Sequence, residues 1–222
     1  MTRSAFPPDL FAFLAELKEH NERDWFNANK DRYETSVVEP ALDFIEAFGP
    51  RLDAISPHFL ADPRRTGGSL FRIYRDTRFS KDKTPYKTTA GLFFRHERAK
   101  DTAAPGFYLH LAPGDVFAGS GIWHPEPAAL KRIRDAIAAR PDAWTEATEG
   151  QTVIGHSLKR APKGFDPDHP LIEDLKRKDF GTLARLSERD VTRPGFVDEY
   201  ARLCASALPL MRFLGQALDV PV

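Results

Sequence analysis

Apolar and polar residues follow helical spacing in the first part of the chain. Residues 8–19 place leucine and phenylalanine side chains three or four positions apart, which predicts a short amphipathic helix. A second helix is expected after Asn21, a candidate N-cap that is followed by acidic residues in the first turn. Pro40 is expected to open a third helix, which contains Phe44 and Phe48 on its apolar side.

The pattern changes in the middle of the chain. Four runs are short, rich in aromatic and aliphatic residues, and bounded by glycine, proline or charged turns, so they are predicted to be strands of one antiparallel sheet. These runs are SLFRIYRD (69–76), TTAGLFFRH (88–96), GFYLHLAPG (106–114) and DVFAGSGIW (115–123), and DFGTLARLS (179–187) is a candidate further strand. The turn signal APGD at 112–115 predicts that the third and fourth runs form a hairpin.

Helical spacing returns at 125–139 and again at 194–219, where Pro209 is expected to kink or divide the last helix. Helices therefore precede and follow a central sheet, which is the α+β pattern. We predict a single α+β domain spanning residues 1–222, with a central antiparallel sheet flanked by N-terminal and C-terminal helices.

The composition excludes several classes of protein. A hydrophobic content of 41% with 29% charged residues is typical of a globular chain and not of a disordered one. No run approaches the ~18 consecutive apolar residues of a membrane-spanning helix, and the first residues lack the layout of a signal peptide, so a cytoplasmic location with no membrane partner is expected. Cys204 is the single cysteine, and its helical apolar surroundings predict a core position without a disulfide.

The chain has no net charge, but its charges are unevenly distributed. Residues 1–63 contain 6 Lys/Arg and 12 Asp/Glu, a balance of −6, whereas residues 64–100 contain 11 and 3, a balance of +8. Residues 101–222 contain 15 and 17, a balance of −2. Such a local block attracts anions even on a neutral protein. Neutralisation by the acidic first third is the alternative.

The segment FRIYRDTRFSKDKTPYKT, residues 71–88, contains six of these cationic side chains. An extended backbone would alternate its side chains between two faces. One face would hold Phe71, Ile73, Arg75 and Thr77, and the other Arg72, Tyr74, Asp76 and Arg78. Asp76 would then lie between arginines and accept paired hydrogen bonds from a guanidinium group. Pro85 restricts the backbone of the loop that follows.

This segment predicts a pocket for a small molecule with a phosphate or carboxylate group. Arginine offers forked, directional contacts, and lysine offers a mobile point charge. The predicted ligand-binding residues are Arg72, Arg75, Asp76, Arg78, Lys83 and Tyr86. Tyr86 and His110 are the candidates for proton transfer, although no reaction is indicated, and His110 shares a predicted strand face with Tyr108. A structural lattice of salt bridges is the alternative interpretation of the same row.

Motifs for common cofactors are absent. The chain has no GxxxxGK[ST] and no GxGxxG that opens a helix, which argues against the usual nucleotide sites, and no HExxH or other close histidine pair that predicts a metal. In FDPDHP, Asp166, Asp168 and His169 have the donor types for a divalent ion, but the prolines favour a rigid loop whose acids cap the next helix.

His124 follows Trp123 at a predicted strand end, a common place for functional groups. These patterns define neither a cofactor nor an oligomeric state.

RIYRDTRFSKDKTPY resembles the defining motif of a widespread bacterial family of conserved hypothetical proteins. The matching positions are Arg72, Arg75, Asp76, Arg78, Phe79, Asp82, Lys83 and Tyr86. The likeness extends to HNERDWFNANKDRY, GIWHPEP, LKRAPKGFDPDHP and PLMRFL, and so covers nearly the whole chain. The resemblance implies a single domain and a cytoplasmic setting, and it implies no particular activity.

Two other partners remain open for the basic segment. Aromatic residues between basic ones can stack on bases and contact phosphates, so nucleic acid is one alternative. The rest of the chain is acidic and the sequence pI is about 7.1, which lacks the overall positive charge of most nucleic-acid-binding proteins. A non-catalytic protein-interaction module, in which the same row docks on an acidic protein surface, is the other alternative.

Overall fold

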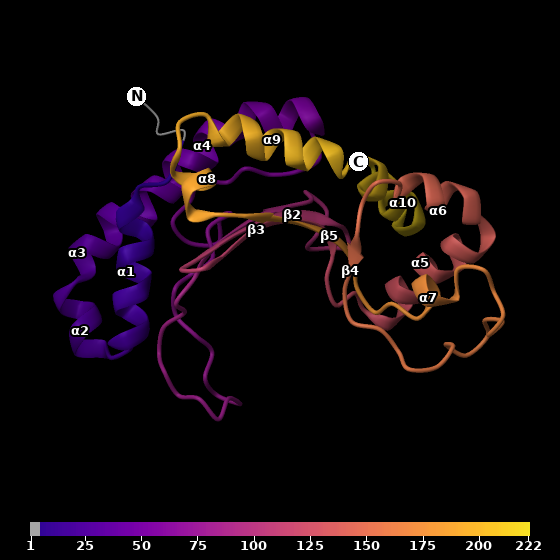
Figure 1. The fold of residues 1–222 in the computed structure, drawn as a ribbon, viewed down its shortest axis with the longest axis horizontal. Coiled ribbons are helices and arrows are strands. Elements are labelled where there is room, and N and C mark those ends of the chain that lie inside the picture. Colours follow the sequence, from indigo (N-terminus) through magenta and orange to yellow (C-terminus); the bar gives the residue numbers. More distant parts are fainter. Residues whose placement is uncertain (1–4) are drawn as a thin grey trace.

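The structure is a computed structural model, and it describes residues 5–222. Its helices are α1 (Pro8–Glu19), α2 (Arg23–Ala28), α3 (Lys30–Tyr33), the π-helix η1 (Glu34–Val38), α4 (Glu39–Ile55), α5 (Pro127–Ala139), α6 (Pro141–Ala147), α7 (Ile172–Leu175), α8 (Glu188–Thr192), α9 (Phe196–Ser206) and α10 (Leu208–Leu218). Its strands are β1 (Ala90–Arg95), β2 (Gly106–Ala112), β3 (Asp115–Ile122), β4 (Val153–Ile154) and β5 (Phe180–Leu186). The predicted α+β class is confirmed, with a central antiparallel sheet and flanking helices (Figure 1).

The five strands form one antiparallel sheet in the order β1-β2-β3-β5-β4. β2 and β3 make the predicted hairpin, in which Ala112 lies opposite Asp115 and Gly114 turns the chain at a φ of 73°. The candidate further strand is β5, whose Phe180 lies opposite Ile122 of β3. β4 was not predicted because its two residues are too short for a periodic pattern.

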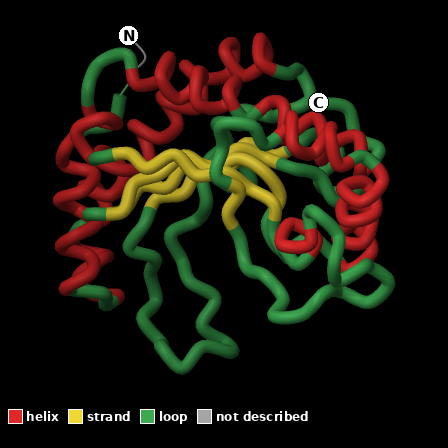
Figure 2. The backbone as a smooth tube through the Cα atoms, turned by 45° about the vertical axis from the view of Figure 1, so that its right-hand side comes forward, coloured by secondary structure: helices red, strands yellow, loops and turns green. Residues whose placement is uncertain are grey.

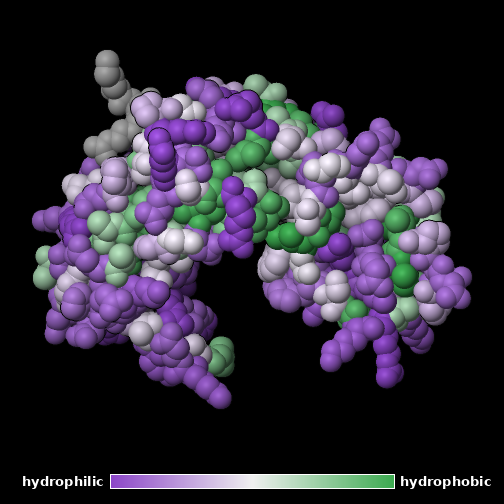
Figure 3. Space-filling model, in the orientation of Figure 1, coloured by the Kyte–Doolittle hydropathy of each residue, from purple (hydrophilic) through white to green (hydrophobic). Residues whose placement is uncertain are grey.

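The two faces of the sheet have different surroundings. Leu92, Leu109 and Ala118 lie in register and are buried on the face covered by α4 and α9 (Figure 1). Phe93 and Tyr108 pair on the opposite face and are only partly buried. The N-terminal helices border that face on one side and α5 and α7 border it on the other, and Figure 3 shows a deep indentation between them.

The apolar core has two parts. In the first, α1, α4 and α9 pack on the sheet, and the Phe48 ring lies edge-on to that of Phe94 at 4.7 Å between centroids. Cys204 belongs to this part and burial raises the pKa of its thiol, which confirms the predicted core position. In the second part, α5, α6 and α10 surround Trp144, whose ring is edge-on to that of Phe213 at 5.2 Å.

The prediction of a strand over residues 69–76 is wrong. Leu70 forms only an isolated bridge with Leu92 of β1, and the Phe71 N–H donates to the Gly91 carbonyl over 2.9 Å. Beyond Phe71 the chain leaves the sheet as an irregular loop, whose outgoing and returning parts run side by side (Figure 2). The charged side chains are solvated there, and Pro85 has no N–H to donate to a ladder.

Two expectations for the helices have different outcomes. Asn21 is not the N-cap of the second helix: α2 begins at Arg23 after Glu22, and no side chain caps it. The last helical segment is divided, as predicted, where α9 and α10 meet at Ala207, just before Pro209. Among the described residues, no helix has both the length and the apolar character to cross a bilayer.

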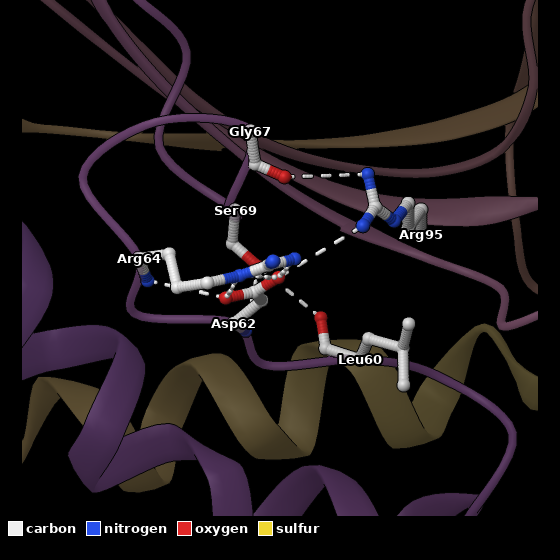
Figure 4. A network of polar contacts seen from close by, with 6 residues as sticks. All are labelled: Leu60, Asp62, Arg64, Gly67, Ser69 and Arg95. Atoms are coloured by element: carbon white, nitrogen blue, oxygen red, sulfur yellow. Dashed lines mark hydrogen bonds and ion pairs between the residues drawn. The ribbon is translucent and has the colours of Figure 1, made fainter.

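A polar network fixes the loop between α4 and β1 (Figure 4). The Asp62 N–H donates to Ser69 Oγ over 3.0 Å, and the Ser69 N–H donates to the Asp62 carbonyl over 2.7 Å. The Asp62 carboxylate accepts a bifurcated hydrogen bond from Arg64 Nε and a second bond from Arg64 Nη2, and Arg95 of β1 lies 3.8 Å from it. Because Ser69 directly precedes Leu70, the network holds the point from which the basic segment leaves the sheet.

Candidate functional site

Residues 71–88 form a projecting hairpin-like loop, which we call the basic arm. Its two limbs are joined by a bridge between Tyr74 and Tyr86 and by hydrogen bonds from the Arg75 N–H to the Pro85 carbonyl and from the Lys87 N–H to the Ile73 carbonyl. In Figure 2 the arm extends away from the sheet. The limbs therefore order each other outside the sheet.

Tyr86 attaches the arm to the N-terminal helices. Its side chain is buried and stacks on Phe26 of α2, with 4.1 Å between ring centroids. The Asn21 side chain accepts from the Tyr86 N–H and donates to the Tyr86 carbonyl, each over 3.0 Å. Burial raises the pKa of Tyr86, so its hydroxyl stays protonated at neutral pH and suits donation rather than the role of a base.

Arg75 is partly neutralised within the arm itself. Its Nη1 donates to Asp82 Oδ2 over 2.5 Å and to the Thr84 hydroxyl. The hydrogen bond from the Thr84 backbone N–H, together with the one from the Arg75 guanidinium group, lowers the pKa of Asp82 to about 2. Asp82 is therefore a carboxylate at neutral pH, and the partner of Arg75 comes from the arm and not from the acidic first third.

Arg78 is also paired locally. Its Nε donates to Asp76 Oδ1 over 3.0 Å and its Nη2 to Asp76 Oδ2 over 2.6 Å, the paired geometry that the sequence predicted for Asp76. Both side chains are exposed, and the Arg78 guanidinium lies 5.9 Å from the ring centroid of its neighbour Phe79. This pair contributes little to stability because solvent screens it.

The remaining cationic groups of the arm have few partners. The Arg72 guanidinium makes no hydrogen bond or ion pair with other residues in 5–222, and Lys87 Nζ donates to the Arg72 carbonyl over 3.0 Å. Burial, with a smaller contribution from Arg72, lowers the pKa of Lys87. Lys83 Nζ donates to the Thr77 carbonyl over 2.9 Å, which uses one of its three protons.

A hollow of about 610 Å³ lies between the arm and α2. It is lined by Asn21, Glu22, Arg23, Asn27, Tyr74, Arg75, Thr77, Lys83, Pro85 and Tyr86. We call it the arm hollow. It collects three of the predicted ligand-binding residues, Arg75, Lys83 and Tyr86, whereas Arg72, Asp76 and Arg78 do not line it. A second hollow of about 410 Å³ shares Asn21, Arg75 and Tyr86 with the first.

A family model matches residues 9–213, which is nearly the whole chain, and its description is "Conserved hypothetical protein (DUF2461)". The chain belongs to this family. The match agrees with the resemblance to a conserved hypothetical family, while the arginine pattern as the mark of that family stays a prediction. A comparison with curated proteins found no match.

His110 of this DUF2461 protein lies apart from Tyr86, its predicted companion in proton transfer. It occupies the partly buried face of β2, where its Nδ1 is 3.1 Å from the Tyr108 hydroxyl, so the shared strand face is confirmed. Burial lowers the pKa of His110. It does not line the arm hollow.

The DUF2461 chain adds residues to the arm hollow that the sequence did not single out. Arg23 and Asn27 come from α2, and Arg23 makes no side-chain hydrogen bond or ion pair with the described residues. The stretch HNERDWFN, residues 20–27, shows that Arg23 and Asn27 are polar positions near the core residue Phe26. The local pattern of polar and apolar residues does not predict that α2 faces the basic arm, which lies some sixty positions further along the chain.

Two other sequence candidates have clear environments in this DUF2461 structure. In FDPDHP, the Asp168 N–H donates to Asp166 and the Leu171 N–H donates to His169 Nδ1, which supports the rigid loop. The expectation that its acids cap the next helix is wrong, because no side chain caps α7. His124 instead meets Asp179 and His156 beyond the ends of β3 and β4. Neither of those partners was singled out from the sequence.

Proposed function

We propose that this protein binds a small anionic molecule, with a phosphate or carboxylate group, in the arm hollow. The observation that supports this most is the convergence of three cationic side chains from two distant segments: Arg23 of α2, and Arg75 and Lys83 of the arm. A volume of about 610 Å³ is in the range of small-molecule sites. Glu22 is the single acidic residue among the lining residues.

The donor groups support the anionic character of the ligand. The hydrogen bonds that Arg75 makes with described residues leave from Nη1, so its Nε and Nη2 have no partner among those residues. The guanidinium donors of Arg23 also have no partner among the described residues. Forked donation from a guanidinium group matches the oxygen pairs of phosphate and carboxylate.

The other walls of the hollow suit a planar or apolar portion of the same ligand. The rings of Tyr74 and Tyr86 are tilted with 5.6 Å between their centroids, and Pro85, next to Tyr86 in the chain, also lines the hollow. Binding sites for small molecules combine such apolar walls with a few directional polar groups. Proton transfer is not included in the proposal, because Tyr86 stays protonated and His110 lies outside the hollow.

Isothermal titration calorimetry with phosphate, pyrophosphate and citrate tests the proposal. Arg23→Gln and Lys83→Gln should each weaken binding about tenfold or more, because each removes a charged hydrogen-bond donor. Arg72→Gln is the matched control, since it removes the same charge from the same arm outside both hollows. The absence of binding by any of these anions, or an equal loss in Arg72→Gln, would contradict the proposal.

A second candidate, binding of single-stranded nucleic acid, has one specific observation in its favour. Phe79 is 96% exposed near the end of the arm, with the Arg78 guanidinium beside its ring. An exposed aromatic next to a cation is the arrangement on which bases stack. Fluorescence anisotropy of a labelled oligonucleotide at low salt tests it: binding lost in Phe79→Ala and kept in Arg23→Gln would favour this candidate over the first.

A further inference from the structure

We propose that His124, His156 and Asp179 form a site for a divalent transition-metal ion of the Zn²⁺ class, separate from the basic arm. The sheet brings the three together. β5 lies between β3 and β4, with Ile122 opposite Phe180 and Ile154 opposite Gly181. Residues just beyond the ends of β3 and β4 therefore lie on either side of Asp179, which directly precedes β5.

The contacts around Asp179 are close and nearly symmetric. Its Oδ1 accepts from the His124 N–H over 2.8 Å and lies 3.0 Å from His124 Nδ1. Its Oδ2 accepts from the His156 N–H over 2.9 Å and lies 2.8 Å from His156 Nδ1. The Asp179 side chain is fully buried. Each carboxylate oxygen thus faces one imidazole. The backbone N–H groups of the same two histidines hold the carboxylate in place.

Core packing does not account for the two rings. The His124 side chain is 64% exposed and the His156 side chain 61% exposed. The rings lie nearly parallel, with 5.6 Å between centroids and 22° between planes, and the half-exposed Trp123 flanks both at 5.5 Å. The two backbone N–H groups give each Asp179 oxygen one hydrogen bond, so each imidazole is a second partner of its oxygen and not the only one.

The donor set and its spacing fit a metal ion. The three side chains offer ligand atoms that all lie within 4.8 Å of one another. Two ligands about 2.1 Å from a tetrahedral Zn²⁺ ion are about 3.4 Å apart, so the Nδ1–oxygen separations of 3.0 and 2.8 Å need to widen by only about half an ångström to admit the ion. Two histidines and one carboxylate are also the protein ligands of several catalytic zinc sites, in which solvent or substrate completes the coordination.

Backbone strain is concentrated at the same place. His124 has a φ of 48°, in the left-handed region, which is uncommon for residues other than glycine. Gly155 has a φ of 140°, and a Cβ there would lie 2.7 Å from the Asp179 Cβ. An imidazole held on strained backbone where a simpler residue would fit better favours a role other than folding.

A second group of potential ligands provides a contrast. His58, His96 and Glu97 also cluster, but His96 is fully buried and both its ring nitrogens are occupied. Its Nε2 lies 2.7 Å from the Pro221 carbonyl, and its Nδ1 accepts from the Arg98 N–H over 3.1 Å. The hydrogen bonds of His96 are therefore already made within the fold, and His58 is left as a matched control.

Calorimetric titration of the chelator-treated, dialysed full chain with Zn²⁺, and visible absorption with Co²⁺, test the site. We expect one ion per chain and a Kd at least tenfold weaker in His124→Asn and in His156→Ala. His124→Asn is chosen because asparagine tolerates the left-handed backbone. His58→Ala should bind as the wild type does, and circular dichroism checks that every variant is folded. No stoichiometric binding, undiminished binding in both site variants, or an equal loss in His58→Ala would overturn the proposal.

Discussion

Asn21 and Tyr86 lie 65 positions apart, and the side-chain amide of Asn21 makes two 3.0 Å hydrogen bonds with the main chain of Tyr86. The amide takes the place of a neighbouring strand, because it satisfies one N–H and one carbonyl of the same residue. Together with the stacking of Tyr86 on Phe26, this contact holds the basic arm against α2. Asn21 and Tyr86 also line the arm hollow, so the residues that make this attachment form part of its wall.

Asn21→Ala should destabilise the protein by about 2 kcal/mol, because two partly buried backbone groups lose their partner. The loss should be local as well as global, so hydrogen exchange of the amides in residues 71–88 should accelerate. Asn27→Ala is the control, since Asn27 lines the same hollow and makes no side-chain hydrogen bond with the described residues. Equal exchange rates in the two variants would show that Asn21 does not hold the arm.

Tyr86→Ala should cost about 3–4 kcal/mol in the free energy of unfolding, the usual result of removing a buried aromatic side chain. Tyr86→Phe should change stability by less than about 1 kcal/mol, because it keeps the stacked ring and the Tyr86 hydroxyl makes no hydrogen bond with the described residues. Urea denaturation measures both. A large loss in Tyr86→Phe would mean that the hydroxyl, and not the ring, attaches the arm.

Gly155→Ala should be destabilising by roughly 1–3 kcal/mol, and more so than Gly164→Ala. Both glycines have positive φ, 140° and 91°, so both variants suffer backbone strain. Only at Gly155 would the new Cβ also collide, 2.7 Å from Asp179 Cβ, whereas nothing lies within 4 Å at Gly164. Thermal unfolding of the two variants compares them, and an equal loss would argue against the close approach to Asp179.

Asp62 makes the free energy of unfolding depend on pH in the acidic range. The hydrogen bond from Arg64 outweighs burial and lowers the pKa of this carboxyl group. A lowered pKa in the folded state means that the contribution is complete above the unfolded pKa of about 3.9 and is lost as the pH falls through the folded value. Asp62→Asn should therefore cost up to about 1 kcal/mol at pH 7 and less at pH 3 in urea denaturation. A difference that grows on acidification would contradict this.

Local signals predicted the parts of the fold that depend on neighbouring residues. The hairpin of β2 and β3 followed from APGD, and the division of α9 from α10 followed from Pro209. Residues 69–76 have the composition of a strand, yet they leave the sheet after Phe71. Propensity gave the wrong result there because charge that must stay solvated and the missing N–H of Pro85 prevent a continuous ladder.

Only part of the arm hollow was predicted from the sequence, because its lining also depends on contacts between distant segments. Charge density pointed to the basic arm, but which cations share a hollow depends on how the arm lies on α2. Arg23 was therefore missed, and Arg72 lies outside the hollow. The group of His124, His156 and Asp179 could not be predicted from the sequence, because it forms only when β5 pairs between β3 and the two-residue β4.

Chemical-shift mapping with inorganic phosphate tests the central claim most directly. In a ¹H–¹⁵N titration of the full chain, we predict saturable shifts for the amides around Arg23, Tyr74 and Lys83, which line the arm hollow from both of its sides. In Lys83→Gln the same shifts should need about tenfold or more phosphate to reach half-saturation, and in Arg72→Gln the titration should match that of the wild type. Unchanged amides around the hollow, or saturable shifts confined to the exposed basic residues Lys159 and Arg160, would contradict the account.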